Sequence, residues 1–309
     1  IPLVAARGPA PPARGCLTCD QLRCFRHPGT ASAVLAGRAA VLVDTWTPEF
    51  AHWLATRGVD ADWFTPWRRR AAWTPAGQGR HVVARLAAWR RSLLLRRRAG
   101  EGGGRQDAVL RASAWIARDL ARRLAPRHTQ LVVDQGMLVP LADAGALQGR
   151  RYDVLVHALP TGELQRRLDA AARRWPDAPS LRDFRADPRF CDAELRALRG
   201  ARRLVTPHAD VARHLRGLGL AQVECLDWIA PVADGPRTPR RPEAATPLVA
   251  FPASALARKG AHELAQALRQ LNWRLLVLGT PSTDTDLWRG IDVQHASYRD
   301  ATWTARADV

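Results

Sequence analysis

Short apolar runs, each bounded by proline, glycine or polar residues, recur along the chain and predict a series of buried strands. The connections between several of these runs carry apolar residues at helical spacing. Strands joined by helices through short links are typical of right-handed βαβ units in a parallel sheet, so we expect an α/β fold. The predicted strands are residues 39–46, 130–136, 152–160, 202–208, 223–231, 248–251, 274–279 and 291–295.

Four segments have the periodicity of helices. Residues 82–98 form a strongly basic helix that the sequence GEGGG at residues 100–104 ends, and a second helix covers residues 106–124. A third follows the strand at 202–208, with Thr206 as its cap and Pro207 in its first turn. The expected inward-facing residues are Val109, Ile116, Leu120 and Leu124 in the second helix, Val211, Leu215 and Leu218 in the third, and Leu264, Leu268 and Leu271 in the fourth.

The length of 309 residues, 47% of them hydrophobic, suffices for two globular domains. We expect an irregular, cysteine-containing segment at residues 1–38 and an α/β domain at 39–231. A proline-rich linker at 232–246 then leads to a second, incomplete α/β domain at 247–309. No run of about 18 apolar residues occurs, so no membrane-spanning segment is expected.

The formal net charge is +18, and arginines spread through every predicted helix supply nearly all of the positive charge. Such a charge suits nucleic acid, but the chain has no named nucleic-acid-binding motif, so we do not expect that partner. Peripheral contact with an anionic membrane or an anionic acceptor is left open. The tryptophans between residues 53 and 89, interleaved with arginines, suit a membrane interface or a sugar; we interpret them as the packing of a long loop.

Three cysteines and a histidine near the N-terminus have the spacing C-x2-C-x4-C-x2-H, which could close around a zinc ion. Reduced structural thiols are the alternative, because the four residues are crowded together. The remaining cysteines are isolated, and scattered cysteines indicate a reducing compartment, so we expect a cytoplasmic protein, with membrane association left open. The four candidate ligands are Cys16, Cys19, Cys24 and His27.

Two residues lie where predicted parallel strands end. Lys259, the single lysine among 47 lysines and arginines, precedes Gly260 at the start of a helix that follows the strand at 248–251. His157 lies near the end of the strand at 152–160. Ligands bind at the carboxyl ends of strands in such sheets, and a helix N-terminus with a lysine suits an anionic phosphate.

The segment 247–309 resembles the donor-binding domain of GT-B-fold, family-4-type retaining glycosyltransferases. Lys259 and Gly260 match the family's "KG" before a helix, and "LLVLGTP", which contains Gly279, is similar to its second strand. The terminal "ATWTARADV" resembles the family's "ADV", and the likeness extends loosely back to about Thr129. In the other half, His157 matches a histidine that faces the donor sugar in that family.

This resemblance implies two Rossmann-like domains facing across a cleft, a nucleotide-sugar donor and a sugar, lipid or protein acceptor. It implies catalytic roles for His157 and Lys259, transfer with retention, and no metal or other cofactor. The donor-binding candidates that it implies are Lys259, Gly260, Arg258, Gly279 and Ser254.

Two departures from the family pattern keep other functions open. The family's phosphate-binding arginine falls on Ser254, and the chain stops at Val309, before the family's paired glutamates. The chain is therefore expected to be a fragment or a degenerate copy. The alternatives to a transferase are a non-catalytic binding scaffold of the same fold and a zinc-bearing nucleic-acid-binding protein.

Overall fold

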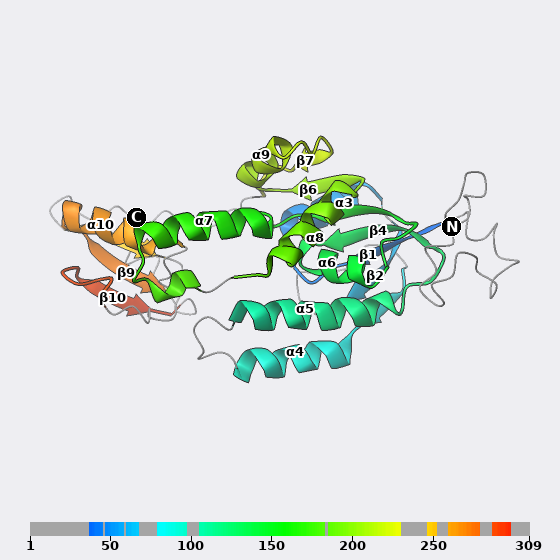
Figure 1. Cartoon of the computed structure of the whole chain (residues 1–309), viewed down its shortest axis with the longest axis horizontal. Coiled ribbons are helices and arrows are strands. Elements are labelled where there is room, and N and C mark those ends of the chain that lie inside the picture. The colour runs from blue at the N-terminus through cyan, green and yellow to red at the C-terminus, as the bar shows by residue number, and fades with distance from the viewer. Residues whose placement is uncertain are drawn as a thin grey trace, which may run out of the picture. The chain divides into compact units, whose positions relative to one another are not determined.

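The computed structural model describes residues 37–45, 47–58, 60–67, 79–97, 105–182, 185–229, 246–251, 259–278 and 286–297. Strands and helices alternate through these residues, as expected for an α/β protein (Figure 1). The elements of the first half are β1 (Arg38–Leu42), α3 (Pro48–Thr56), β2 (Ala61–Thr65), β3 (His81–Val83), α4 (Arg85–Arg97), α5 (Arg105–Ala121), β4 (His128–Asp134), α6 (Gln135–Asp143) and β5 (Arg151–Leu155). They are followed by α7 (Thr161–Arg174), η2 (Pro179–Arg182), α8 (Pro188–Arg199), β6 (Arg203–Thr206), α9 (Ala209–Gly217), β7 (Val223–Cys225), β8 (Leu248–Phe251), α10 (Ala261–Leu271), β9 (Arg274–Leu278) and β10 (Val293–Ala296).

The first sheet has seven strands in the order β3-β2-β1-β4-β5-β6-β7, and every neighbouring pair is parallel. The chain builds outward from β1 in one direction and from β4 in the other. Strand order therefore reverses between β1 and β4, and in doubly wound sheets ligands bind outside the carboxyl ends of the strands at such a point.

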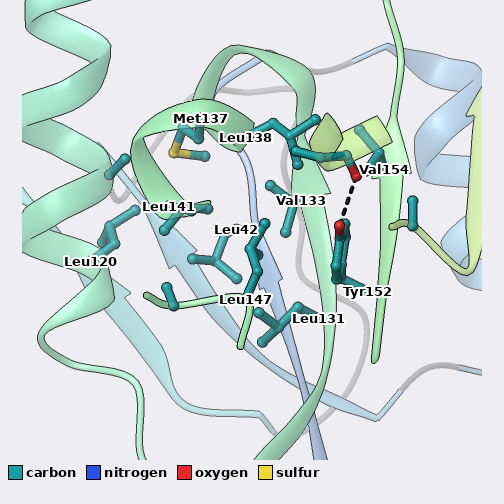
Figure 2. Close-up of a cluster of buried hydrophobic side chains, with 14 of the residues drawn as sticks. Leu42, Leu120, Leu131, Val133, Met137, Leu138, Leu141, Leu147, Tyr152 and Val154 are labelled. Carbon is teal, nitrogen blue, oxygen red and sulfur yellow. Dashed lines mark hydrogen bonds between the residues drawn. The ribbon is translucent and has the colours of Figure 1, made fainter. Parts of the chain in front are cut away.

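Alternating side chains of the first sheet fill two separate cores. Val41 of β1, and Val43 directly after the strand, point to one face, where Phe50 and Trp53 of α3 cover them. Ala40 and Leu42 point to the opposite face, against a larger cluster that draws residues from α5, α6, α8 and α9. Figure 2 shows this larger core, including Leu42, Leu120, Met137 and Leu141.

Tyr152 lies at the margin of the larger core, and its hydroxyl donates a 2.7 Å hydrogen bond to the carbonyl oxygen of Ala197 in α8 (Figure 2). Burial raises the pKa of this phenol, so it stays neutral and keeps its proton for the bond. Gly200 lies directly beside it: a Cβ at this position would come within 2.6 Å of the Tyr152 hydroxyl oxygen. This close approach explains glycine at the end of α8.

A buried ionic cluster lies where β1, β2 and β4 begin, at the opposite edge from their carboxyl ends. Asp62 Oδ1 accepts from Arg38 Nε at 2.7 Å and from the Arg80 backbone N–H at 3.0 Å. Asp62 Oδ2 accepts from Arg127 and from His128 Nε2, both at 3.0 Å. Burial opposes ionisation of Asp62, but these donors outweigh it and hold its pKa well below the usual range.

The second sheet is separate and has three parallel strands in the order β10-β9-β8. Leu268 of α10 packs on Leu275 and Val277 of β9. The expected α/β class, with a second parallel sheet separate from the first, is confirmed. The chain divides into two compact units, and the second contains residues 165–185 and 231–309. The segment at 165–185, predicted to lie in the first domain, therefore belongs to the same unit as the small sheet. The predicted domain boundaries remain predictions.

Several local predictions are wrong. Val82 and Val83 belong to strand β3 and not to the basic helix, and Trp63 lies in the buried strand β2 and not in a loop. Val109, Leu218 and Leu271, expected to face inward, are 36%, 37% and 52% exposed. Helix α5 buries small residues such as Ala108 and Ala112 instead.

The end of one strand and the start of one helix also differ from the prediction. The strand expected at 130–136 ends at Asp134, so Gly136 lies inside α6. Helix α9 has His208 and not Thr206 at its N-cap, and His208 provides no side-chain hydrogen bond there. The Thr206 hydroxyl instead accepts the His208 backbone N–H at 3.2 Å.

Candidate functional site

A buried carboxylate lies at the ends of β1 and β4, the two strands between which the strand order of the first sheet reverses. Asp134 is the last residue of β4, is 1% exposed, and is the N-cap of α6. Its Oδ1 accepts the Gly136 backbone N–H at 2.7 Å, and its Oδ2 accepts the Thr45 backbone N–H at 2.7 Å. Thr45 follows β1, so one side chain bridges the ends of the two strands between which the order reverses. The carboxylate is therefore fixed by backbone donors on both sides.

The imidazole of His157 faces this carboxylate. His157 follows β5, the strand next to β4, and its Nδ1 lies 3.9 Å from Asp134 Oδ1. Nδ1 is buried and has no hydrogen-bond partner among the described residues, whereas the side chain as a whole is 28% exposed. The side chain is therefore exposed at atoms other than Nδ1.

The loop that carries His157 is held by buried side chains. Gln135 Oε1 accepts the backbone N–H groups of His157 and Ala158 at 3.2 and 3.1 Å, and its Nε2 donates to Glu194 Oε1 at 3.0 Å. The other Glu194 oxygen accepts the Thr161 N–H at 2.6 Å. Gln135 and Glu194 are 8% and 3% exposed, so a buried hydrogen-bond network holds the backbone of His157 in place.

Burial raises the pKa of Asp134, and this effect outweighs the charge of His157 and the Thr45 and Gly136 N–H groups, which lower it. The nearby carboxylate of Asp44 raises it further, although Asp44 is itself ion-paired with Arg91 of α4. When Asp134 is ionised, its charge favours a proton on the facing His157 Nδ1. That tautomer leaves Nε2 with a free lone pair, which is the arrangement of a general base.

A second polar group lies at the N-terminus of α3. Glu49 is 3% exposed; its Oε1 accepts the Ile229 N–H at 3.0 Å, and its Oε2 has no hydrogen-bond partner among the described residues. Burial opposes ionisation of Glu49, but the Thr47 hydroxyl, the backbone N–H groups and the charge of His208 together lower its pKa. The His208 ring lies edge to face with Trp228, with ring centres 5.1 Å apart.

A hollow of about 800 Å³ opens beside this group, between α3 and β7. Glu49, Trp53, Arg57 and Glu224 contribute to its walls. Trp53 Nε1 and Arg57 both donate to Glu224 Oε1, at 2.9 and 2.7 Å. Trp53, Arg57 and Glu224 are thus already hydrogen-bonded to each other. The hollow could hold a ligand, but these three side chains offer it few free hydrogen-bonding groups.

The predicted donor site belongs to the second unit. Gly260 is the N-cap of α10 with φ of +84°, a backbone conformation that favours glycine, and Lys259 precedes it and is exposed. Both residues therefore lie at the N-terminus of the helix that follows β8, as predicted. Their binding role stays a prediction. His157 and Lys259 belong to different units, so each is described within its own unit.

Other predicted site residues lie outside the described residues: Ser254, Arg258, Gly279 and the candidate zinc ligands Cys16, Cys19, Cys24 and His27. Within the described ranges, no group of three His, Cys, Asp or Glu side chains gathers in a way that suits a metal ion. None of the described helices is long and apolar enough to cross a membrane.

Sequence reasoning found His157 but missed its partners Asp134, Thr45 and Gln135. One signal was available: the aspartate in "LVVDQG" ends an apolar run and precedes a glycine, as a helix N-cap at a strand end does. Its pairing with His157 depends on β4 and β5 being neighbours, which the sequence alone does not state.

Comparisons with known proteins find no matching family model and no matching curated protein. Solved structures do match, at low identity. CalG4, the calicheamicin glycosyltransferase, is 13% identical over 85% of this chain and 70% of its own, with a TM-score of 0.38. LpCGTa in complex with UDP is 15% identical over 86% and 72%, with a TM-score of 0.42. Arabidopsis thaliana UGT89C1 complexed with UDP-L-rhamnose is 11% identical over 84% and 70%, with a TM-score of 0.41. At these TM-scores the matches carry no functional argument, and the fold class rests on the two parallel α/β sheets themselves.

Proposed function

We propose that the chain is a glycosyltransferase, which moves a sugar from a nucleotide-sugar donor to a hydroxyl group of an acceptor. The observation that carries the proposal is the His157–Asp134 pair at the reversal of strand order. A partly exposed histidine backed by a buried carboxylate can take the proton of an attacking hydroxyl. The resemblance of residues 247–309 to a donor-binding domain supports the choice of substrate.

The transfer step uses the two candidate groups differently. The acceptor O–H loses its proton to His157 Nε2, and the acceptor oxygen forms a bond to the anomeric carbon of the sugar. The bond from that carbon to the phosphate oxygen breaks, and the nucleoside diphosphate leaves with the electron pair. Asp134 stabilises the imidazolium, while Lys259 and the N-terminus of α10 would neutralise charge on the departing diphosphate.

The separation of 3.9 Å between Nδ1 and Oδ1 exceeds a hydrogen bond. The pair therefore becomes a working dyad only when the His157 ring moves toward Asp134 by about 1 Å, as catalytic contacts do when substrate binds. Because Asp134 is fixed by two backbone donors, the ring is the part that moves.

The stereochemical course of the transfer depends on whether His157 acts as the general base. The family resemblance predicts retention of configuration, whereas a base that activates the acceptor for in-line attack predicts inversion. Proton NMR of the first-formed product distinguishes the two through the coupling constant of its anomeric proton.

The direct test of the function is calorimetric titration with a panel of nucleotide-sugars, followed by measurement of nucleoside diphosphate release with hydroxyl acceptors. Binding of a donor together with acceptor-dependent release supports the proposal. Binding without release, in wild type and His157→Ala alike, would favour the non-catalytic scaffold, which serine in place of arginine at position 254 also supports. No binding of any nucleotide-sugar would overturn the proposal.

A further inference from the structure

Helix α4 presents large apolar side chains to solvent. Leu86 is 60% exposed and Trp89 is 55% exposed, and they lie three residues apart on one face, with the half-buried Leu93 four residues further along. The inward face of the helix is made of Ala87 and Ala88. Helix α4 thus has small residues toward the protein and large ones outward, the reverse of an ordinary surface helix.

Unpaired positive charge surrounds this apolar face. Arg85, Arg90, Arg96 and Arg97 are exposed, and none of them has a carboxylate partner within the part of the chain that the structure describes. The neighbouring helix α5, which packs against α4 (Figure 1), differs in this respect. Arg111 of α5, and Arg122 and Arg123 directly after it, lie within 4 Å of an aspartate of α5, although Arg118 of the helix has no such partner among the described residues. Among the described residues, no carboxylate therefore offsets the charge of the four α4 arginines.

A basic hollow adjoins the start of the helix. It has a volume of about 520 Å³, and Arg80, Arg85 and Arg123 lie in its wall together with Leu86. Arg123 is already paired with Asp119, so Arg80 and Arg85 are the arginines of this hollow that suit an anionic oxygen group such as a phosphate. The hollow is continuous with the apolar face, because Leu86 belongs to both.

We propose that α4 docks the protein on the surface of an anionic lipid bilayer. Leu86 and Trp89 lie at the boundary of headgroups and acyl chains, the arginines of the helix contact lipid phosphates, and the hollow with Arg80 and Arg85 receives one headgroup. A basic helix with leucine and tryptophan on its outward face is the composition of an interfacial helix. The inference does not depend on the proposed sugar transfer.

A nucleic acid would also attract the arginines, but it gives no reason for Leu86 and Trp89 to lie among them. Of the large apolar side chains that are exposed in the described residues, Leu86 is second only to Trp228, and Trp89 is third. Both are on the helix with the unpaired arginines. A bilayer surface uses both features at once, since apolar burial and electrostatic attraction add in interfacial binding.

The test is vesicle flotation of the full chain with two kinds of vesicle, phosphatidylcholine alone and an equal mixture of phosphatidylcholine and phosphatidylglycerol. Two variants change the α4 face: L86S/W89S removes the apolar part, and R90Q/R96Q/R97Q removes charge. Leu271→Ser in α10 is the apolar control, because Leu271 is 52% exposed. R199Q/R213Q/R216Q, in α8 and α9, is the control for charge, since these arginines are also exposed. A thermal melt of each variant confirms folding.

We expect binding to the anionic vesicles alone. The charge variant should bind roughly 100-fold more weakly, because each arginine near an anionic surface contributes about fivefold, and the apolar variant about tenfold more weakly or beyond. The vesicle affinity of both controls should stay within about threefold of wild type, and the small loss expected for the charge control reflects its lower net charge. Binding at about 1 M salt should fall sharply, because the screening length shrinks to about 3 Å.

Three results would overturn the proposal. Equal binding to both vesicle types would remove the anionic surface as the partner. Equal weakening in the α4 charge variant and in its control would show that only net charge matters. Unchanged vesicle binding in L86S/W89S, together with displacement of the vesicles by double-stranded DNA, would assign the basic face to nucleic acid.

Discussion

Replacing Asp62 by asparagine should strongly destabilise the first sheet, because this side chain joins the first residues of three strands. Its two oxygens accept four hydrogen bonds, from Arg38, Arg80, Arg127 and His128. An amide nitrogen in place of either oxygen would face two donors. His128 cannot respond by changing tautomer without loss, because its Nδ1 already accepts the Ala125 N–H at 2.9 Å.

The magnitude follows from which donors lose their partner. His128 is 3% exposed at its side chain, so its Nε2–H would be buried without an acceptor, which costs about 1–3 kcal/mol. Arg38 and Arg127 are 31% and 50% exposed, so water replaces much of what they lose. Asp62→Asn should therefore lower the free energy of unfolding by about 3 kcal/mol in total, which is at the low end for breaking a buried ionic cluster.

Asp60→Asn is a matched control, since Asp60 pairs with the same Arg38 but is 68% exposed. We expect it to cost less than about 1 kcal/mol. The assay is hydrogen exchange of the β1, β2 and β4 amides in increasing urea, which reports the first unit separately from the second. Equal effects of the two substitutions would refute the account of the cluster.

The same cluster predicts a pH dependence. Because the folded-state pKa of Asp62 lies below its unfolded value of about 3.9, its contribution is complete above that value and is lost as pH falls below it. The pKa of His128 is also lowered, chiefly by burial, which adds acid sensitivity below about pH 6.5. The stability gap between wild type and Asp62→Asn should therefore shrink from pH 7 to pH 3, and a constant gap would contradict the pairing.

Other substitutions test separate parts of the structure. Gly200→Ala should lower the free energy of unfolding by about 1–3 kcal/mol in urea denaturation, because its Cβ would collide with the Tyr152 hydroxyl. Gly217→Ala is the control: its Cβ would have nothing within 4 Å, so it should be neutral or stabilise by about 0.4–1 kcal/mol. Similar effects of the two substitutions would refute the contact with Tyr152. Gly260→Ala should cost about 1 kcal/mol, because φ there is +84°, and the same denaturation series measures it. Lys259→Ala should weaken nucleotide-sugar binding ten- to hundredfold in calorimetry, about 1.5–3 kcal/mol, and Lys259→Arg should recover part of the loss; unchanged affinity in Lys259→Ala for every donor would remove this residue from the donor site.

The parallel α/β class could be read from the sequence, because apolar runs of strand length end in polar residues and helical periodicity separates them. The strand at 130–136 and the helix after Gly260 are located to within two residues, and the strand at 152–160 starts within one residue but ends five residues early, at Leu155. Strand β2 was missed because all five of its residues are buried, so "ADWFT" shows no alternation of polar and apolar positions. Helix α6 was missed because Gly136 and Pro140 both lie in it and normally indicate a break.

The candidate site was only half predictable for a related reason. A histidine at a strand end can be located from one segment of sequence, but a pair needs two neighbouring strands in known register. Parallel pairing of β4 with β5 places Asp134 opposite Leu155, two residues before His157. Burial of Asp134, which raises its pKa, likewise depends on β1 and α6 closing over it.

The most direct measurement for the proposed function is turnover of His157→Ala beside its affinity for the donor. With a nucleotide-sugar and acceptor on which wild type is active, kcat should fall about 10²–10⁴-fold, the usual contribution of a general base. Donor affinity measured by calorimetry should stay within about twofold, because the histidine acts on the acceptor hydroxyl and not on the diphosphate. Unchanged kcat in His157→Ala would contradict the account, and so would a loss of donor affinity as large as the loss of turnover.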